Sequence, residues 1–90
     1  MRELTPMTGK EIKQAMDISR AMTMEAVRAR KKWPLFASAH EGWGVLREEY
    51  KELEAEIMKK SPDRSTMAKE AMQVGAMAIR IIQDCCGGKV

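Results

Sequence analysis

The sequence has few of the residues that form disulfide frameworks and zinc sites. Its 90 residues include two cysteines, the neighbours Cys85 and Cys86, and a single histidine, His40. Adjacent cysteines rarely form a disulfide because the geometry is strained, and two thiols with one distant imidazole make a poor zinc site. We therefore expect reduced thiols with a structural role.

The sequence also lacks a long apolar run and a strong excess of one charge. No stretch reaches membrane-spanning length, and the N-terminal MRELTPMTGK has no apolar segment of the kind that signal peptides contain. The 16 basic and 13 acidic side chains give a formal net charge of +3, which is too small to indicate nucleic acid as a partner. The sequence therefore predicts a cytoplasmic protein without membrane association, and nucleic-acid binding is not expected.

Nothing in the sequence divides the chain into separate units. It contains no linker-like tract, no block of like charges and no internal repeat, so the sequence predicts one helical domain over residues 1–90. A domain of this size buries a smaller share of its surface than a larger one, and oligomerisation often compensates for this. We therefore expect a partner chain.

Apolar side chains recur every three or four residues in three segments, which predicts three long helices. The first covers residues 8–32, from the capping box TGKE to the residues before the proline of KKWPL. The second ends near SPDR at 61–64, and the third begins there, with Ser61 or Ser65 as its cap, and ends near residues 87–89. Long helices with short connections favour an antiparallel arrangement.

The second and third helices each have distinct faces. The apolar stripe of the second helix, which we expect to be buried, contains Trp43, Leu46, Tyr50, Leu53 and Ile57. A stripe about a quarter turn away contains Val45, Glu49, Glu52 and Glu56. The third helix has a polar stripe with Glu70, Gln73, Met77, Arg80 and Asp84. Its broad apolar face can pack against one neighbour in its own chain and one in a partner. If the two helices are antiparallel, their polar stripes can face each other.

The glutamates of the second helix permit two interpretations. Glu49 and Glu52 are three residues apart and are therefore neighbours on one helical face. If they are buried without a cation, each carboxylate raises the pKa of the other, whereas a divalent ion favours both charges. Spacing alone favours a solvated, salt-bridged face, to which we assign Glu54 and Glu56.

Two segments resemble a known family. EEYKE at 48–52 matches the EExxE element of the MazG-like all-α nucleoside triphosphate pyrophosphohydrolases, and the preceding HEGWGVLREEY looks like the lead-in of its short members. KEAMQVGAMAIRIIQD at 69–84 is similar to the family's third-helix segment, in which an acid precedes a run rich in alanine and methionine with a basic residue near its end. The resemblance covers residues 40–84, about half of the chain.

The resemblance implies both a fold and an activity. The fold is all-α, with three main helices per chain that form a four-helix-bundle core across a homodimer, or across a tetramer made of two dimers. The activity is Mg²⁺-dependent hydrolysis of a (deoxy)nucleoside triphosphate to the monophosphate and pyrophosphate, with Mn²⁺ as a substitute for Mg²⁺. Such a cation polarises phosphoryl oxygens and orients the attacking water.

The resemblance also implies ligands for the metal. Matched by position, Glu49, Glu52 and Glu70 are metal ligands, and Gln73 occupies the remaining ligand position, where the family has the aspartate of an ExxD motif. An amide oxygen can bind Mg²⁺ but brings no charge and no base. Glu48 and Glu49 are the catalytic candidates, because a carboxylate near the metal can take a proton from water.

Three further residues are candidates for binding the substrate. Arg80 has the planar fork that suits phosphate oxygens, with a salt bridge to Glu70, Asp84 or an acid of a partner chain as the alternative role. Lys32 can also meet phosphate charge, and Trp33 can stack on a base, although aromatic residues at helical spacing often belong to the core. The alternative function is a catalytically weak helical module that binds nucleotide or a protein partner, and Gln73 is the residue that favours it.

Overall fold

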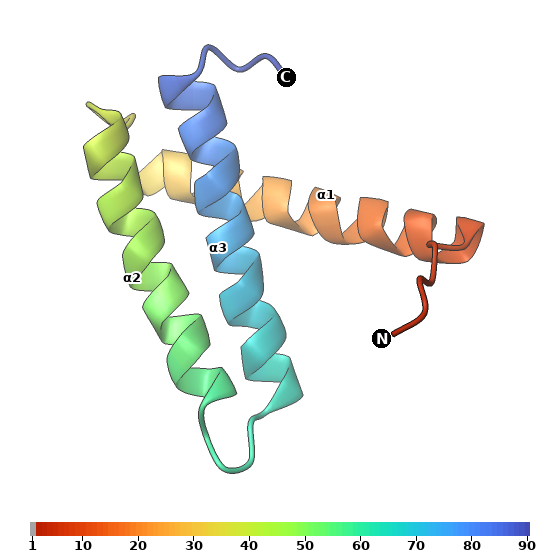
Figure 1. Cartoon of the computed structure of the whole chain (residues 1–90). Helices are drawn as coiled ribbons and strands as arrows, with labels where there is room; N and C mark the ends of the chain where they lie inside the picture. Colours follow the sequence, from red (N-terminus) through yellow and green to blue (C-terminus); the bar gives the residue numbers. More distant parts are fainter. Residues whose placement is uncertain (1) are drawn as a thin grey trace.

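The structure is a computed structural model that describes residues 2–90. Within that range it consists of α1 (Gly9–Lys32), α2 (Ala39–Ile57) and α3 (Arg64–Cys85), without a β-strand. The predicted all-α fold with three helices is confirmed. Helices α2 and α3 form an antiparallel hairpin, and α1 crosses α3 so that its N-terminal half projects away from the hairpin (Figure 1). Among residues 2–90, no helix combines the length and the apolar character needed to cross a membrane.

Side-chain caps fix where the helices begin. The capping box of α1 is confirmed, since the Glu11 amide donates to Thr8 Oγ1 at 3.1 Å and the Thr8 amide donates to Glu11 Oε1 at 3.0 Å. The predicted cap of α3 was wrong: Asp63 caps this helix, and its Oδ2 accepts from the Thr66 amide at 2.9 Å and from the Thr66 hydroxyl at 2.6 Å. One carboxylate oxygen thus accepts two hydrogen bonds, and a cap of this kind contributes about 1 kcal/mol.

Helix α3 lies at the centre of the fold. It packs against α2 and against α1, whereas α1 and α2 do not pack against each other in the described part of the chain. The buried apolar side chains are Ala26 of α1, Phe36 of the connection between α1 and α2, and Ala76 and Met77 of α3. The broad apolar face of α3 therefore has two neighbours within its own chain, and its predicted packing against a partner chain stays a prediction.

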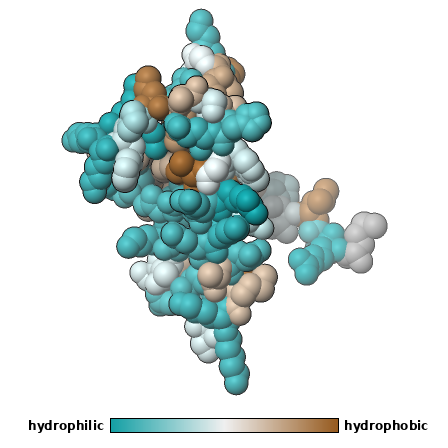
Figure 2. Space-filling view, turned by 90° about the vertical axis from the view of Figure 1, so that its left-hand side faces the viewer, coloured by the Kyte–Doolittle hydropathy of each residue, from teal (hydrophilic) through white to brown (hydrophobic). Residues whose placement is uncertain are grey.

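The predicted burial of the Trp43 stripe of α2 is confirmed only in part within this chain. Leu46 packs against the core and Leu53 is half-buried, whereas Trp43 is 56% exposed and Tyr50 and Ile57 are each 45% exposed. The stripe that contains Val45 turns closer to α3, because Gly42 lies on it. A Cβ atom at Gly42 would lie 2.9 Å from Cγ1 of Ile81 and 3.1 Å from Cδ2 of Phe36, so this close approach needs a glycine. The outward face of α2 is mostly hydrophilic, with separate hydrophobic groups (Figure 2).

Glu56 is also placed differently from the prediction. It is only 4% exposed, rather than part of a solvated face. Its carboxylate accepts from Lys59 Nζ at 2.8 Å and from the Asp63 amide at 2.9 Å. Glu56 therefore holds the connection between α2 and α3 against the end of α2, which fixes how the two helices are aligned.

Candidate metal centre and adjoining cavity

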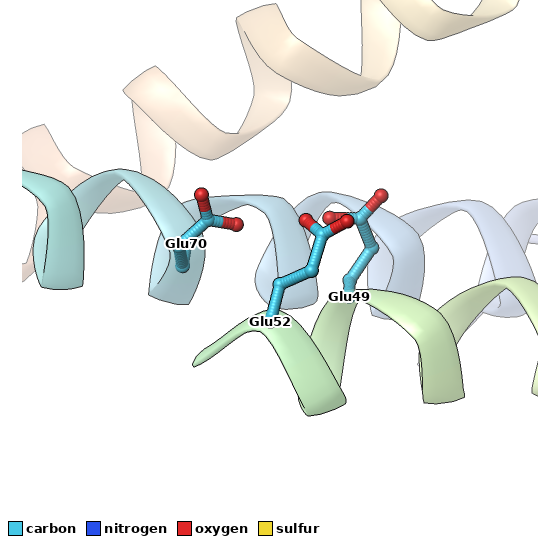
Figure 3. A group of neighbouring side chains, drawn as sticks. All are labelled: Glu49, Glu52 and Glu70. Carbon is cyan, nitrogen blue, oxygen red and sulfur yellow. The ribbon is translucent and has the colours of Figure 1, made fainter. Parts of the chain in front are cut away.

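Three glutamates from two helices converge near the middle of the hairpin. Glu49 and Glu52 lie one turn apart on α2, and the antiparallel pairing brings Glu70 of α3 opposite them (Figure 3). One carboxylate oxygen from each of these residues lies within 4.8 Å of the others. Glu49 and Glu70 are half-buried, whereas Glu52 is exposed. We call these three residues the acidic triad.

The acidic triad is electrostatically unfavourable for three ionised carboxylates. Burial raises the pKa of Glu49, and the nearby charges of Glu52 and Glu70 raise it further. Burial also raises the pKa of Glu70, together with a hydrogen bond and charge repulsion from Glu52. A proton relieves this repulsion, and so does a divalent cation. All three donors are carboxylate oxygens, so the set fits Mg²⁺ or Mn²⁺.

A cavity of about 550 Å³ adjoins the acidic triad. Its volume lies in the range typical of small-molecule sites. All three helices and the connection between α1 and α2 contribute to its wall. The lining residues are Ala29, Trp33, Pro34, Phe36, Glu41, Val45, Glu48, Glu49, Gln73, Met77 and Arg80. Glu49 belongs both to the triad and to the cavity, so a ligand in the cavity can reach the triad.

Arg80 is a buried cation in the cavity wall without an acidic partner. It is 3% exposed, and its Nη2 donates to the Pro34 carbonyl at 2.9 Å. Its guanidinium lies over the Phe36 ring, 4.2 Å from the centroid. Among residues 2–90 it forms no salt bridge, and its buried Nε lacks a hydrogen-bond partner. The alternative that Arg80 pairs with Glu70 or Asp84 is therefore wrong within these residues, and a pair with an acid of a partner chain stays a prediction.

The connection that carries Trp33 and Phe36 is fastened to α3 at two points. Arg80 binds it through the Pro34 carbonyl, and Asp84 Oδ2 accepts from the Phe36 amide at 3.0 Å. Trp33 lines the cavity and remains 64% exposed, so its ring is accessible to a ligand. Asp84 and Arg80 thus position the aromatic end of the cavity.

Lys32 and Glu48 differ in their relation to the site. Glu48 lines the cavity next to Glu49 and is exposed to solvent. Lys32 is the last residue of α1, is exposed, and is absent from the cavity lining. The structure therefore brings Glu48, Glu49, Gln73, Arg80 and Trp33 together around the cavity, but it does not bring Lys32 there.

The sequence did not predict that Glu25 would contact Gln73 of the cavity wall. Gln73 Nε2 donates to Glu25 Oε2 at 2.9 Å, which links α3 to α1. The hydrogen bond from Arg28 and then that from Gln73 lower the pKa of Glu25. A sequence signal for Glu25 exists, because it lies three residues after Met22 and four before Ala29, on the face of α1 that turns toward α3.

Comparison with known proteins identified no relative of this chain. No protein-family model matches the chain, and neither a curated protein nor a solved structure matches it. The resemblance to the MazG-like enzymes therefore depends on the motifs of the sequence itself and stays a prediction.

Proposed function

We propose that the protein is a Mg²⁺-dependent pyrophosphohydrolase that cleaves a (deoxy)nucleoside triphosphate to the monophosphate and pyrophosphate. The observation that supports this most directly is the convergence of Glu49, Glu52 and Glu70 within 4.8 Å beside a cavity of about 550 Å³. Three carboxylates at this distance repel one another, and a divalent cation converts that repulsion into attraction. The EExxE resemblance gives this arrangement a specific reaction.

The three triad carboxylates hold the cation in this proposal. The cation, when bound, polarises the phosphoryl oxygens and orients the attacking water. Glu48 and Glu49, which line the cavity, are the groups that can accept the proton from this water.

The other end of the cavity suits the rest of the nucleotide. The exposed ring of Trp33 can stack on a base, and it lies in the same cavity wall as the Arg80 guanidinium. Arg80 is buried without an acidic partner, so an anionic phosphate would supply the missing counter-charge. A cation at one end and a guanidinium along the wall together match a negatively charged triphosphate chain.

A second copy of the chain completes the proposed assembly. Helix α1 exposes several large apolar side chains, which are Ile12, Met16, Ile18, Met24 and Val27. Trp43, Tyr50 and Ile57 of the Trp43 stripe of α2 are also exposed. Burying these residues against a second chain removes apolar surface from water at about 25 cal/mol per Å². We propose a homodimer with a four-helix core, or a tetramer made of two such dimers.

Pyrophosphate release tests this function. The protein is incubated with Mg²⁺ and a panel of canonical and damaged (deoxy)nucleoside triphosphates, and the products are separated. We expect the monophosphate and pyrophosphate from at least one nucleotide, and loss of activity in Glu49→Gln and Glu70→Gln. Glu54→Gln is the matched control, because Glu54 is exposed on α2 and accepts from the Tyr50 hydroxyl at 3.2 Å. Absence of pyrophosphate with every nucleotide, from protein that is folded, would refute the enzymatic proposal.

The alternative is a helical module that binds nucleotide or a protein partner without turnover. Gln73 favours it, because an amide replaces the carboxylate of the ExxD motif and donates its hydrogen bond to Glu25. Calorimetry separates the alternatives. Tight binding of the Mg²⁺–nucleotide without pyrophosphate release indicates a sensor, and absence of both indicates a protein-binding role.

A further inference from the structure

The contact between Gln73 and Glu25 fixes the orientation of an amide at the site. An ionised carboxylate is only an acceptor, so the amide nitrogen of Gln73 must face Glu25, where the two atoms are 2.9 Å apart. The amide oxygen then lies on the opposite side of the planar carboxamide. In the described residues, no group donates a hydrogen bond to this oxygen. The oxygen is therefore free to bind a ligand.

Gln73 lies close to the acidic triad in the sequence of α3 and in the wall of the cavity. It follows Glu70 by three residues on α3, so the two side chains are neighbours on one face of the helix. It also lines the cavity together with Glu49, a member of the acidic triad. An amide oxygen is an ordinary ligand for Mg²⁺ and related hard cations.

The Glu25 carboxylate is engaged by two donors. Arg28 forms an ion pair with one of its oxygens from the next turn of α1, and Gln73 donates to the other. A carboxylate in an ion pair with a guanidinium carries no proton to donate, so Glu25 accepts from Gln73. The contact joins residues that are 48 positions apart, so it depends on the packing of α1 against α3.

We propose that Glu25 is a positioning residue of the metal site, which holds the Gln73 amide so that its oxygen stays available to a cation at the acidic triad. This inference rests on the proposed function. In this chain, a glutamine stands on α3 where the resemblance has an aspartate, and a glutamate on α1 orients its amide. Helix α1 thereby becomes part of the site, although it contributes no residue to the triad.

Titration calorimetry with Mn²⁺ alone, without nucleotide, tests the inference independently of activity. Glu25→Gln keeps the size of the side chain but removes its charge and lets it donate as well as accept. We expect Mn²⁺ affinity to fall about tenfold, as is typical when a group that orients a metal ligand is lost. Asp17→Asn is the matched control: it removes one charge from an exposed part of α1, and we expect wild-type affinity.

The exchanged pair Glu25→Gln with Gln73→Glu separates positioning from packing. In this variant the amide at 25 donates to the carboxylate at 73, so the bond between the helices and the total charge are kept. We expect its Mn²⁺ affinity to equal or exceed that of the wild type. A contact that only holds the helices together would change the melting temperature but leave Mn²⁺ affinity unchanged in Glu25→Gln, and this result would overturn the inference. Failure of the exchanged pair to restore binding would also overturn it. Absence of Mn²⁺ binding by the wild type would instead refute the metal site itself.

Discussion

Two glycines of α2 allow a direct test of how this helix faces α3. Gly42 and Gly44 lie two residues apart in the same helix, so alanine gains about 1 kcal/mol of helix propensity at either position. At Gly44, a Cβ atom meets nothing within 4 Å. At Gly42, it would lie 2.9 Å from Ile81 Cγ1 and 3.1 Å from Phe36 Cδ2, and such overpacking costs about 1–3 kcal/mol.

The two variants should therefore change the free energy of unfolding by different amounts, or in opposite directions. We expect Gly44→Ala to raise the free energy of unfolding by about 1 kcal/mol. For Gly42→Ala the same gain is opposed by the close contacts of the new Cβ atom with Ile81 and Phe36. We therefore expect its free energy of unfolding to be about 1–3 kcal/mol below that of Gly44→Ala. Urea unfolding followed by circular dichroism, at one protein concentration, measures both. If the two variants are stabilised equally, Gly42 does not face α3 and the packing described for the hairpin is incorrect.

Three other predictions concern charge, association and the cavity. The hydrogen bonds to Glu56 lower the pKa of its carboxylate, so its contribution to stability is present above the unfolded pKa and is lost as the pH falls through the folded pKa. Glu56→Gln should therefore lower the melting temperature at pH 7 but have little effect in strong acid, and an equal effect at both pH values would contradict this role. Trp43→Glu should shift sedimentation toward the monomer, whereas an unchanged oligomer would exclude the exposed α2 stripe from the interface. Arg80→Met removes a buried charge without an acidic partner, so we expect unchanged or higher stability with nucleotide affinity about 10- to 100-fold lower; unchanged affinity in equilibrium binding would exclude a phosphate contact.

Local signals in the sequence were sufficient to predict the helices. The TGKE capping box marks the start of α1, and apolar spacing marks all three helices, because both features act over one or two turns. The sequence allowed the residues of the acidic triad to meet but did not require it, since a short connection favours antiparallel α2 and α3 and the resemblance named the three residues. Whether Glu70 lies opposite Glu52 also depends on the rotation and the alignment of the two helices.

The rotation of α2 about its own axis could not be predicted in the same way. Apolar spacing identified the Trp43 stripe, but the stripe that packs against α3 is set by Gly42, whose close neighbours Phe36 and Ile81 lie outside α2. Gly42 and Gly44 lie only two positions apart, and nothing in the neighbouring sequence indicates which of them has no room for a Cβ atom. The consequence is that part of the apolar surface of α2 faces outward, where the sequence predicted a core.

Residues that depend on contacts between distant segments were also missed. The link between Glu25 and Gln73 spans 48 positions, and the fastening of Phe36 by Asp84 spans the same number. Arg80 was predicted as a phosphate contact from its place on the polar stripe. Its lack of an acidic partner is a property of the folded chain, because Asp84 on the same stripe binds the connection to α2 instead.

The most direct test of the account is a crystal structure with Mn²⁺ and a non-hydrolysable (deoxy)nucleoside triphosphate. Anomalous scattering locates the ion independently of the protein density. The account predicts Mn²⁺ bound by carboxylate oxygens of Glu49, Glu52 and Glu70, with the triphosphate beside it in the cavity. A bound nucleotide with no ion at these three residues, or an ion bound only elsewhere on the chain, would contradict it.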